Sequence, residues 1–277
     1  MQIFGLDFTS VPSGRKPITV VETNLVDQLL QVDPELICLP SLAAFEVFLT
    51  QTGPWLAGLD FPFGQPQKLI KNLGWPETWS GYVGLIANMS LNEFEATLTT
   101  YRRSRPTGDK HHLRLTDLKA RARSPMMLVG VPVGKMFFQG APRLLQSNVS
   151  VLPCRPTNDN RIVLETYPAL VARRWIGSAS YKNDAKNKQT AAQAAARQNI
   201  IEGILSPSFA TEFGFGLELE TVLADRLSQD PAGDQLDALL CALQAAWAYL
   251  QADRHYGIPL DCDPAEGWII DPDLRLE

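Results

Sequence analysis

Acidic residues stand at the ends of several apolar segments of this chain, where charge is unusual. The run QIFGLD closes on Asp7, WLAGLD closes on Asp60, and RIVLE closes on Glu165. Carboxylates gathered at one place repel one another unless a cation neutralises them. Carboxylate oxygens are ligands that suit a hard divalent cation such as Mg²⁺ or Mn²⁺. The pattern therefore predicts a metal site built from strand ends.

Two more acids, Asp234 and Asp237, open the run GDQLDALLCALQAAWAYL, which predicts a long apolar helix. Their spacing of three residues puts them on one face of that helix. Aspartate in a first turn also stabilises a helix by capping and by the helix dipole. Capping explains only one of the two acids, and two like charges on one face repel each other unless something binds them. We therefore keep both Asp234 and Asp237 as candidate metal ligands.

The other acids also have ordinary structural interpretations. Asp7 can cap the turn that follows it, with Thr9 and Ser10 as hydroxyl neighbours, and Asp60 shares this ambiguity because GLDF occurs at both places. Glu165 at a strand end can simply be solvated. We keep these three residues as candidate catalytic groups beside Asp234 and Asp237.

These acids need a sheet and helices to position them. The apolar segments predict strands over Gln2–Asp7, Ile18–Glu22, Leu36–Leu39, Trp55–Asp60 and Arg161–Glu165. Helical spacing predicts a helix after Ser41 and helices over Tyr167–Ile176, Asp184–Leu205, Leu217–Leu227 and Asp234–Gln251. The segments before Asp7 and Asp60 are hydrophobic throughout, as in central strands buried on both faces. We expect an α/β fold with helices on both faces of the sheet, and a site at strand ends.

Residues 61–160 have a different pattern, which begins with the turn-rich stretch FPFGQP. Helices are expected near Gln67–Leu73, Thr78–Met89 and Asn92–Arg103. No Pro- or Gly-rich linker separates this region from its surroundings. We therefore expect residues 1–277 to form one domain, with residues 61–160 as a mainly helical insertion that covers one edge of the core.

A basic segment from Arg102 to Arg123 lies within this insertion. Runs of charge are usually solvated, and the alternative is a surface that contacts phosphate groups. Lys182 raises the same question. We expect Arg121, Arg123 and Lys182 to contact the phosphates of a substrate, because arginine suits bidentate phosphate contacts.

Composition limits the classes of protein. The formal net charge of −5 excludes a global basic field, and four scattered cysteines with three histidines make a structural zinc site improbable. We find no targeting signal and no apolar run long enough to cross a membrane. We therefore expect a cytoplasmic protein with no membrane partner, and the sequence does not indicate its oligomeric state.

Four motifs occur in order along nearly the whole chain: GLDFTS, GLDFPFG, ETYPALVARRW followed by YKND, and DQLDALLCALQAAWA. Together they resemble an uncharacterised family of predicted nucleases with an RNase H-like fold, domain of unknown function family 429. The resemblance implies a mixed sheet flanked by helices, with a large insertion after the fourth strand.

The resemblance also implies roles for particular residues. Asp7 would lie on the first strand, Asp60 on the fourth, and Asp234 and Asp237 on the closing helix, like the paired acids in RuvC-type resolvases. Glu165 would be the acid of strand five. Tyr167, which we include among the substrate-binding candidates, stands where many members carry histidine, so a histidine-dependent proton transfer is disfavoured.

The function expected from these residues is metal-dependent hydrolysis of nucleic acid. Two Mg²⁺ or Mn²⁺ ions about 3.5–4 Å apart would stabilise the attacking and leaving oxygens, with Asp7 as the bridging ligand. One alternative is a nucleotide-binding phosphotransferase or ATPase of the related actin-like fold, because Asp7, Thr9 and Ser10 partly imitate its first phosphate loop. Another is a catalytically silent binding protein. Whether the substrate is DNA, RNA or a free nucleotide is left open.

Overall fold

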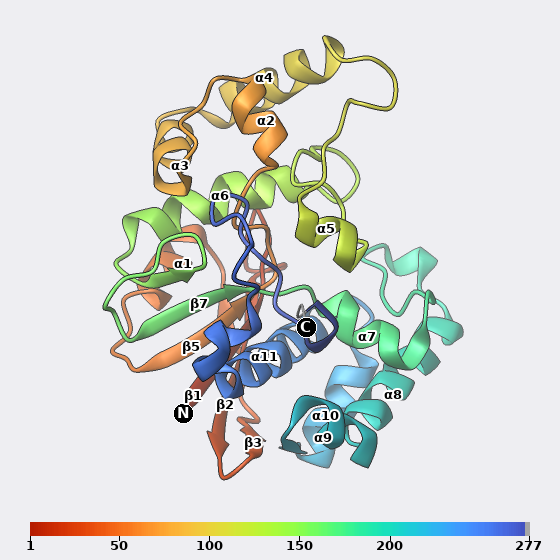
Figure 1. The fold of residues 1–277 in the computed structure, drawn as a ribbon. Coiled ribbons are helices and arrows are strands. Elements are labelled where there is room, and N and C mark those ends of the chain that lie inside the picture. The colour runs from red at the N-terminus through yellow and green to blue at the C-terminus, as the bar shows by residue number, and fades with distance from the viewer. Residues whose placement is uncertain (275–277) are drawn as a thin grey trace.

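The structure is a computed structural model that describes residues 1–274, apart from the side chain of residue 186. Within these residues it contains an eight-stranded mixed sheet in the order β6-β7-β5-β1-β2-β3-β8, with β4 also paired to β2 (Figure 1). The strands are β1 Gln2–Asp7, β2 Ile18–Val26, β3 Leu29–Val32, β4 Ile37–Leu39, β5 Trp55–Leu59, β6 Ser150–Leu152, β7 Arg161–Glu165 and β8 Gly216–Glu218.

The central strands run in two patterns. β1 is antiparallel to β2, and β2 is antiparallel to β3 and β4. On the other side, β1 is parallel to β5, β5 to β7, and β7 to β6. The carboxyl ends of β1, β5 and β7 therefore lie at the same edge of the sheet, which brings the expected acidic segment ends together as predicted.

Helices cover both faces of the sheet, which confirms the expected α/β class. Before and within the insertion are α1 Leu42–Phe48, α2 Gln67–Asn72, α3 Trp79–Ala87, α4 Leu91–Arg103, α5 Leu115–Ala120 and α6 Val133–Gln146. After β7 follow α7 Pro168–Ile176, α8 Ala191–Ile204, α9 Pro207–Phe213, α10 Thr221–Gln229 and α11 Asp234–Leu250. Short 3-10 turns are η1 Lys186–Lys188, η2 Ala252–Gly257 and η3 Pro272–Leu274.

The alternation of side chains along β1 assigns the two faces. Ile3 belongs to the core that α7 to α11 complete, whereas Phe4 and Leu6 belong to the core that α1 and the insertion helices complete. Successive side chains of a strand point to opposite faces, so Gly5 and Asp7 share the face of Ile3. In Figure 1, α2, α3 and α4 gather at the top of the molecule, away from α8, α9 and α10.

The long helix α11 lies against β1 and β5 because both strands carry glycine at the contact. Gly5 and Gly58 are paired across the two strands. A Cβ atom on Gly5 would stand 2.0 Å from the carbonyl oxygen of Ala238, and one on Gly58 would stand 2.6 Å from that of Cys241. Absence of a side chain therefore lets the helix backbone approach the sheet directly.

Several expected elements differ in the structure. The hairpin of β2 and β3 turns through Asp27 and Gln28, both with positive φ, and neither residue carries the usual glycine or asparagine signal of such a turn. This unexpected strand makes Trp55–Leu59 the fifth strand of the chain instead of the fourth. The expected strands over β1 and β7 and the expected helices over α2, α3, α4, α7 and α11 are confirmed.

The expected helix over Leu217–Leu227 was wrong at its start. Gly216–Glu218 forms β8, which pairs in parallel with β3, and α10 begins only at Thr221. The helix expected from Asp184 begins instead at Ala191, where Thr190 and Gln193 form a capping box. Within residues 61–160 the sequence also did not indicate α6, which contains Pro142, or β6, which extends the sheet.

We predict that Gly5→Ala destabilises the protein by at least about 3 kcal/mol, since added atoms in a packed core cost roughly 1–3 kcal/mol and these meet rigid backbone. Urea denaturation measures the change. Gly14→Ala is the matched control, because a Cβ there meets nothing within 4 Å. Equal stability of the two variants would contradict the direct contact between α11 and β1.

Candidate metal centre

Asp7 and Asp60 reach the same space because both follow the glycine contact by two residues. Asp7 is the last residue of β1, and Asp60 comes directly after β5. The period of two along a strand puts Asp7 on the face of Gly5, and Asp60 continues the face of Gly58. Both carboxylates therefore point toward the face that α11 covers.

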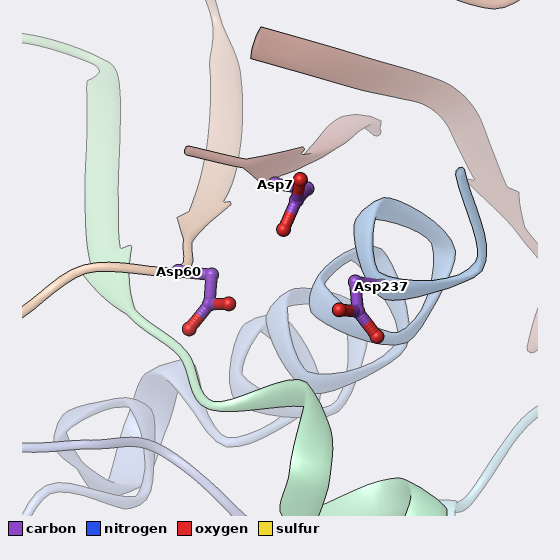
Figure 2. A group of neighbouring side chains, drawn as sticks. All are labelled: Asp7, Asp60 and Asp237. Atoms are coloured by element: carbon purple, nitrogen blue, oxygen red, sulfur yellow. The ribbon is translucent and has the colours of Figure 1, made fainter. Parts of the chain in front are cut away.

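Asp237 completes the group from the first turn of α11. One oxygen from each of Asp7, Asp60 and Asp237 lies within 4.8 Å of the others. Figure 2 shows the three carboxylates directed toward a common space between the strand ends and the helix. We call these residues the carboxylate cluster.

Two members of the carboxylate cluster have no protein partner. Asp7 is 8% exposed, and among the described residues no hydrogen bond reaches the carboxylate of Asp7 or Asp60. Asp237 is fully buried and accepts hydrogen bonds from the Tyr181 hydroxyl at 2.5 Å and from the Lys182 ammonium. Buried polar groups are normally hydrogen-bonded, so the carboxylates of the two strand ends are suited to an additional ligand.

The electrostatics of the cluster are unfavourable for ionised carboxylates. Burial raises the pKa of Asp7 well above its ordinary range; Lys182 opposes this effect, and Asp237, Asp234 and Asp60 add to it by repulsion. Burial, with repulsion from Asp237, also raises the pKa of Asp60 to about 7. A divalent cation among these oxygens would reverse both effects.

The donor set fits a hard divalent cation. Three carboxylates from three separate elements supply oxygen ligands only, which favours Mg²⁺ or Mn²⁺ over the softer metals that prefer sulfur and imidazole. The expectation of a metal site at Asp7, Asp60 and the start of the last helix therefore fits the geometry.

Asp234, the fourth expected ligand, lies outside the carboxylate cluster. It is half-buried and lines the same cleft. Burial raises the pKa of Asp234, while Lys16 and Lys182 lower it. Its neighbour in the first turn, Asp237, occupies the position nearer to the strand ends, as expected if only one of the pair is a ligand.

Glu165 lies in the same cleft but is held by an arginine. Both of its oxygens accept hydrogen bonds from Arg114, at 2.6 and 2.8 Å, and the backbone N–H of Phe63 donates to it at 2.9 Å. Arg114 also forms an ion pair with Asp117 at 2.7 Å. The expected acid of β7 therefore anchors the insertion to the sheet and is not part of the carboxylate cluster.

A cleft of about 740 Å³ lies over the carboxylate cluster. Four basic residues line it: Lys16, Arg123 and Lys182, and the buried Arg114. Tyr167 also lines the cleft, and its hydroxyl accepts a hydrogen bond from Arg173 at 3.2 Å. Arg121 is exposed and is not among the lining residues, so of the two expected arginines only Arg123 faces the cleft.

The sequence did not single out Tyr181, Lys16 or Arg114. Tyr181 stands in the YKND motif, which contributes only to the family resemblance. Lys16 lies in the loop before β2 and forms an ion pair with Asp184 at 2.8 Å, a contact that no local pattern indicates. Arg114 is 1% exposed, and its arginine-x-x-aspartate spacing with Asp117 is the available signal.

Fold and site together define a mixed α/β protein with a carboxylate centre at the carboxyl edge of its sheet. The family model described as "Protein of unknown function (DUF429)" matches residues 29–261, so the chain belongs to this family. Asp60 and Asp237 fall within the match and Asp7 precedes it. Neither the curated proteins nor the solved structures gave a match. In the part of the chain described, none of the helices combines the length and apolar character needed to cross a membrane.

We predict that the metal-free protein loses stability between about pH 4 and pH 7. A carboxyl group whose folded pKa is raised binds its proton more tightly in the folded state, so the free energy of unfolding falls as pH rises through about 4 to 7. One pKa unit corresponds to about 1.4 kcal/mol, and partial exposure reduces the effect of Asp60 to roughly 1–3 kcal/mol. Urea titrations in EDTA measure it.

Asp60→Asn removes this titration, so the variant should be more stable than the wild type at pH 8 and should depend less on pH. Asp225→Asn, an exposed position on α10, is the control and should follow the wild type. A wild type that gains stability toward pH 8 in parallel with Asp60→Asn would contradict the prediction.

Proposed function

We propose that this protein is a metal-dependent nuclease that hydrolyses phosphodiester bonds of nucleic acid with Mg²⁺ or Mn²⁺. The observation that carries the proposal is the carboxylate cluster at the floor of a cleft. Its strand-end members, the buried Asp7 and the half-buried Asp60, have no hydrogen-bond partner among residues 1–274. Ionising acids in such a place costs free energy, and a bound cation would offset that cost by stabilising the charged carboxylates.

The residues of the cleft have complementary tasks in such a reaction. Asp7, Asp60 and Asp237 would hold the cation, which supplies a Lewis acid and lowers the pKa of water. Lys16, Arg123 and Lys182 would bind phosphate oxygens from the walls. In the reaction the oxygen of water bonds to phosphorus and water gives up a proton to the solvent, while the bond from phosphorus to the leaving oxygen breaks and that oxygen takes up a proton from the solvent to become an alcohol.

Tyr167 is not suited to accept the proton that the attacking water loses. Burial raises its pKa, although Arg173 opposes this effect, and the phenol therefore stays protonated at neutral pH. Its hydroxyl is already partnered by Arg173. We propose that Tyr167 shapes the cleft wall.

The proposal includes an RNase H-like fold. An antiparallel run β1, β2 and β3, followed by parallel β5 and β7 and closed by a helix that brings an acid to the strand ends, supports it. The insertion follows β5, the strand that carries the second acid.

A nucleotide-binding phosphotransferase is the second candidate. Thr9 and Ser10 line the cleft directly after Asp7, which is where hydroxyl groups could contact a phosphate. A catalytically silent binding protein is the third, and it would hold the ion without turning over a substrate.

We predict that the wild type cleaves a labelled oligonucleotide in Mn²⁺ and that Asp7→Asn lowers the rate more than about 100-fold. Even groups that only support metal ligands contribute roughly 10–100-fold. DNA and RNA, single- and double-stranded, are the substrates, and Asp225→Asn is the control. Phosphate transfer from ATP without cleavage of any polymer would favour the phosphotransferase, and Mn²⁺ binding without either reaction would favour the binding protein.

We predict that Arg123→Gln weakens oligonucleotide binding and lowers the slope of log K against log salt by about 0.7–0.9, the value for one lost phosphate contact. Fluorescence anisotropy measures both in an Asp60→Asn background, which prevents cleavage. Arg103→Gln, an exposed residue in the last turn of α4 outside the cleft lining, is the matched control. Equal losses in both variants would place the substrate elsewhere.

A further inference from the structure

We propose that the site holds one divalent ion, and that the ammonium group of Lys182 stands where a second ion would otherwise bind. This inference rests on the proposed function, since it concerns the same site. It replaces the two-ion arrangement expected from the sequence with a single ion and a resident lysine.

The number of available acids supports a single ion. Among residues 1–274 one group of three carboxylates has oxygens close enough to share an ion. Two ions about 3.5–4 Å apart each require several oxygen ligands and a bridging carboxylate. Glu165 is not free to serve, because Arg114 binds both of its oxygens. Asp234 lies outside the group.

Lys182 occupies the oxygen of Asp237 that a second ion would need as a ligand. Its ammonium forms an ion pair with Oδ2 of Asp237, and the Tyr181 hydroxyl donates to Oδ1 at 2.5 Å. Each oxygen of Asp237 therefore already has one partner. The remaining lone pairs of Asp237 are sufficient for it to coordinate one ion together with Asp7 and Asp60.

Contacts with the segment before α11 hold Lys182 in position. A Cβ atom at Gly233 would stand 2.9 Å from Cβ and 3.0 Å from Cδ of Lys182, so the aliphatic stem lies on the residue that precedes α11. The N–H of the next residue, Asn183, donates to the carbonyl of Pro231 at 3.0 Å. Unlike a free surface lysine, Lys182 is held against the start of the helix that carries Asp237.

Charge balance agrees with this arrangement. Three ionised carboxylates are neutralised by one divalent ion together with one ammonium group, whereas a second divalent ion would leave an excess of positive charge. The charge of Lys182 already lowers the pKa of both Asp7 and Asp60, so it acts on the whole cluster.

The arrangement also gives Lys182 a role toward the substrate. An ammonium group has three donors, and the ion pair with Asp237 leaves donors for another acceptor. Lys182 lines the cleft, and its side chain is 39% exposed. It can therefore donate to a phosphate oxygen of a substrate in the cleft.

Titration of Mn²⁺ into the full-length protein at pH 8 tests the proposal, with calorimetry for the affinity and electron paramagnetic resonance for the stoichiometry. The wild type should bind one ion per chain, and Asp60→Asn should lose it. Lys182→Met keeps the stem on Gly233 and removes the charge, so it should bind Mn²⁺ at least about tenfold more tightly. Lys182→Arg keeps the charge and should stay near the wild type.

Lys188→Met is the matched control, since this lysine is exposed and outside the cleft lining. Lys182→Gln serves as a second uncharged variant if Lys182→Met does not fold. Two ions in the wild type, or unchanged affinity in the uncharged variants, would overturn the inference and leave the proposed function standing. No binding of Mn²⁺ by the wild type would overturn both.

Discussion

The close contact between α11 and the two central strands is the constraint on which the site depends. Gly5 and Gly58 are neighbours across β1 and β5, and the helix backbone occupies the space that their side chains would fill. Two residues further along each strand the pleat returns to the same face, and there the chain carries aspartate. The packing that brings the helix to the sheet is therefore the packing that brings Asp237 to Asp7 and Asp60.

This arrangement holds the carboxylates in fixed positions where they repel one another when ionised. Strand ends and a long buried helix hold the carboxylates in place, and burial raises the pKa of Asp7 and Asp60. Tyr181 and Lys182 donate hydrogen bonds to Asp237, and the charge of Lys182 also lowers the pKa of Asp7 and Asp60. Like charges fixed close together are expected at sites that bind a cation, because the binding free energy compensates the repulsion.

A second buried network ties the insertion to this core. Arg114 connects Asp117 in the insertion with Glu165 at the end of β7, and it also donates to the backbone carbonyl of Glu266 near the C-terminus at 2.9 Å. Removing one partner of a buried ion pair leaves the other charge uncompensated. The wall of the cleft that carries Arg123 is thus positioned through an acid of the sheet, which explains why Glu165 is buried without belonging to the carboxylate cluster.

The sequence by itself determined the central strands, their acidic ends and the closing helix, because period and apolar content are local properties of the chain. It also indicated that Asp7 and Asp60 stand in the same local context, since GLDF occurs twice. It could not indicate β8, whose short segment is a strand only because it pairs with β3.

Only the tertiary structure decided which acids converge. Glu165 and Arg114 are 51 residues apart, and Lys182 and Asp237 are 55 residues apart, so no local spacing predicts either pair. The choice of Asp237 over Asp234 follows from the rotation of α11 about its axis, and that rotation is determined by how the helix backbone seats on Gly5 and Gly58. Contacts between distant segments, and not residue type, therefore determine which carboxylates join the cluster and which pair with an arginine or a lysine.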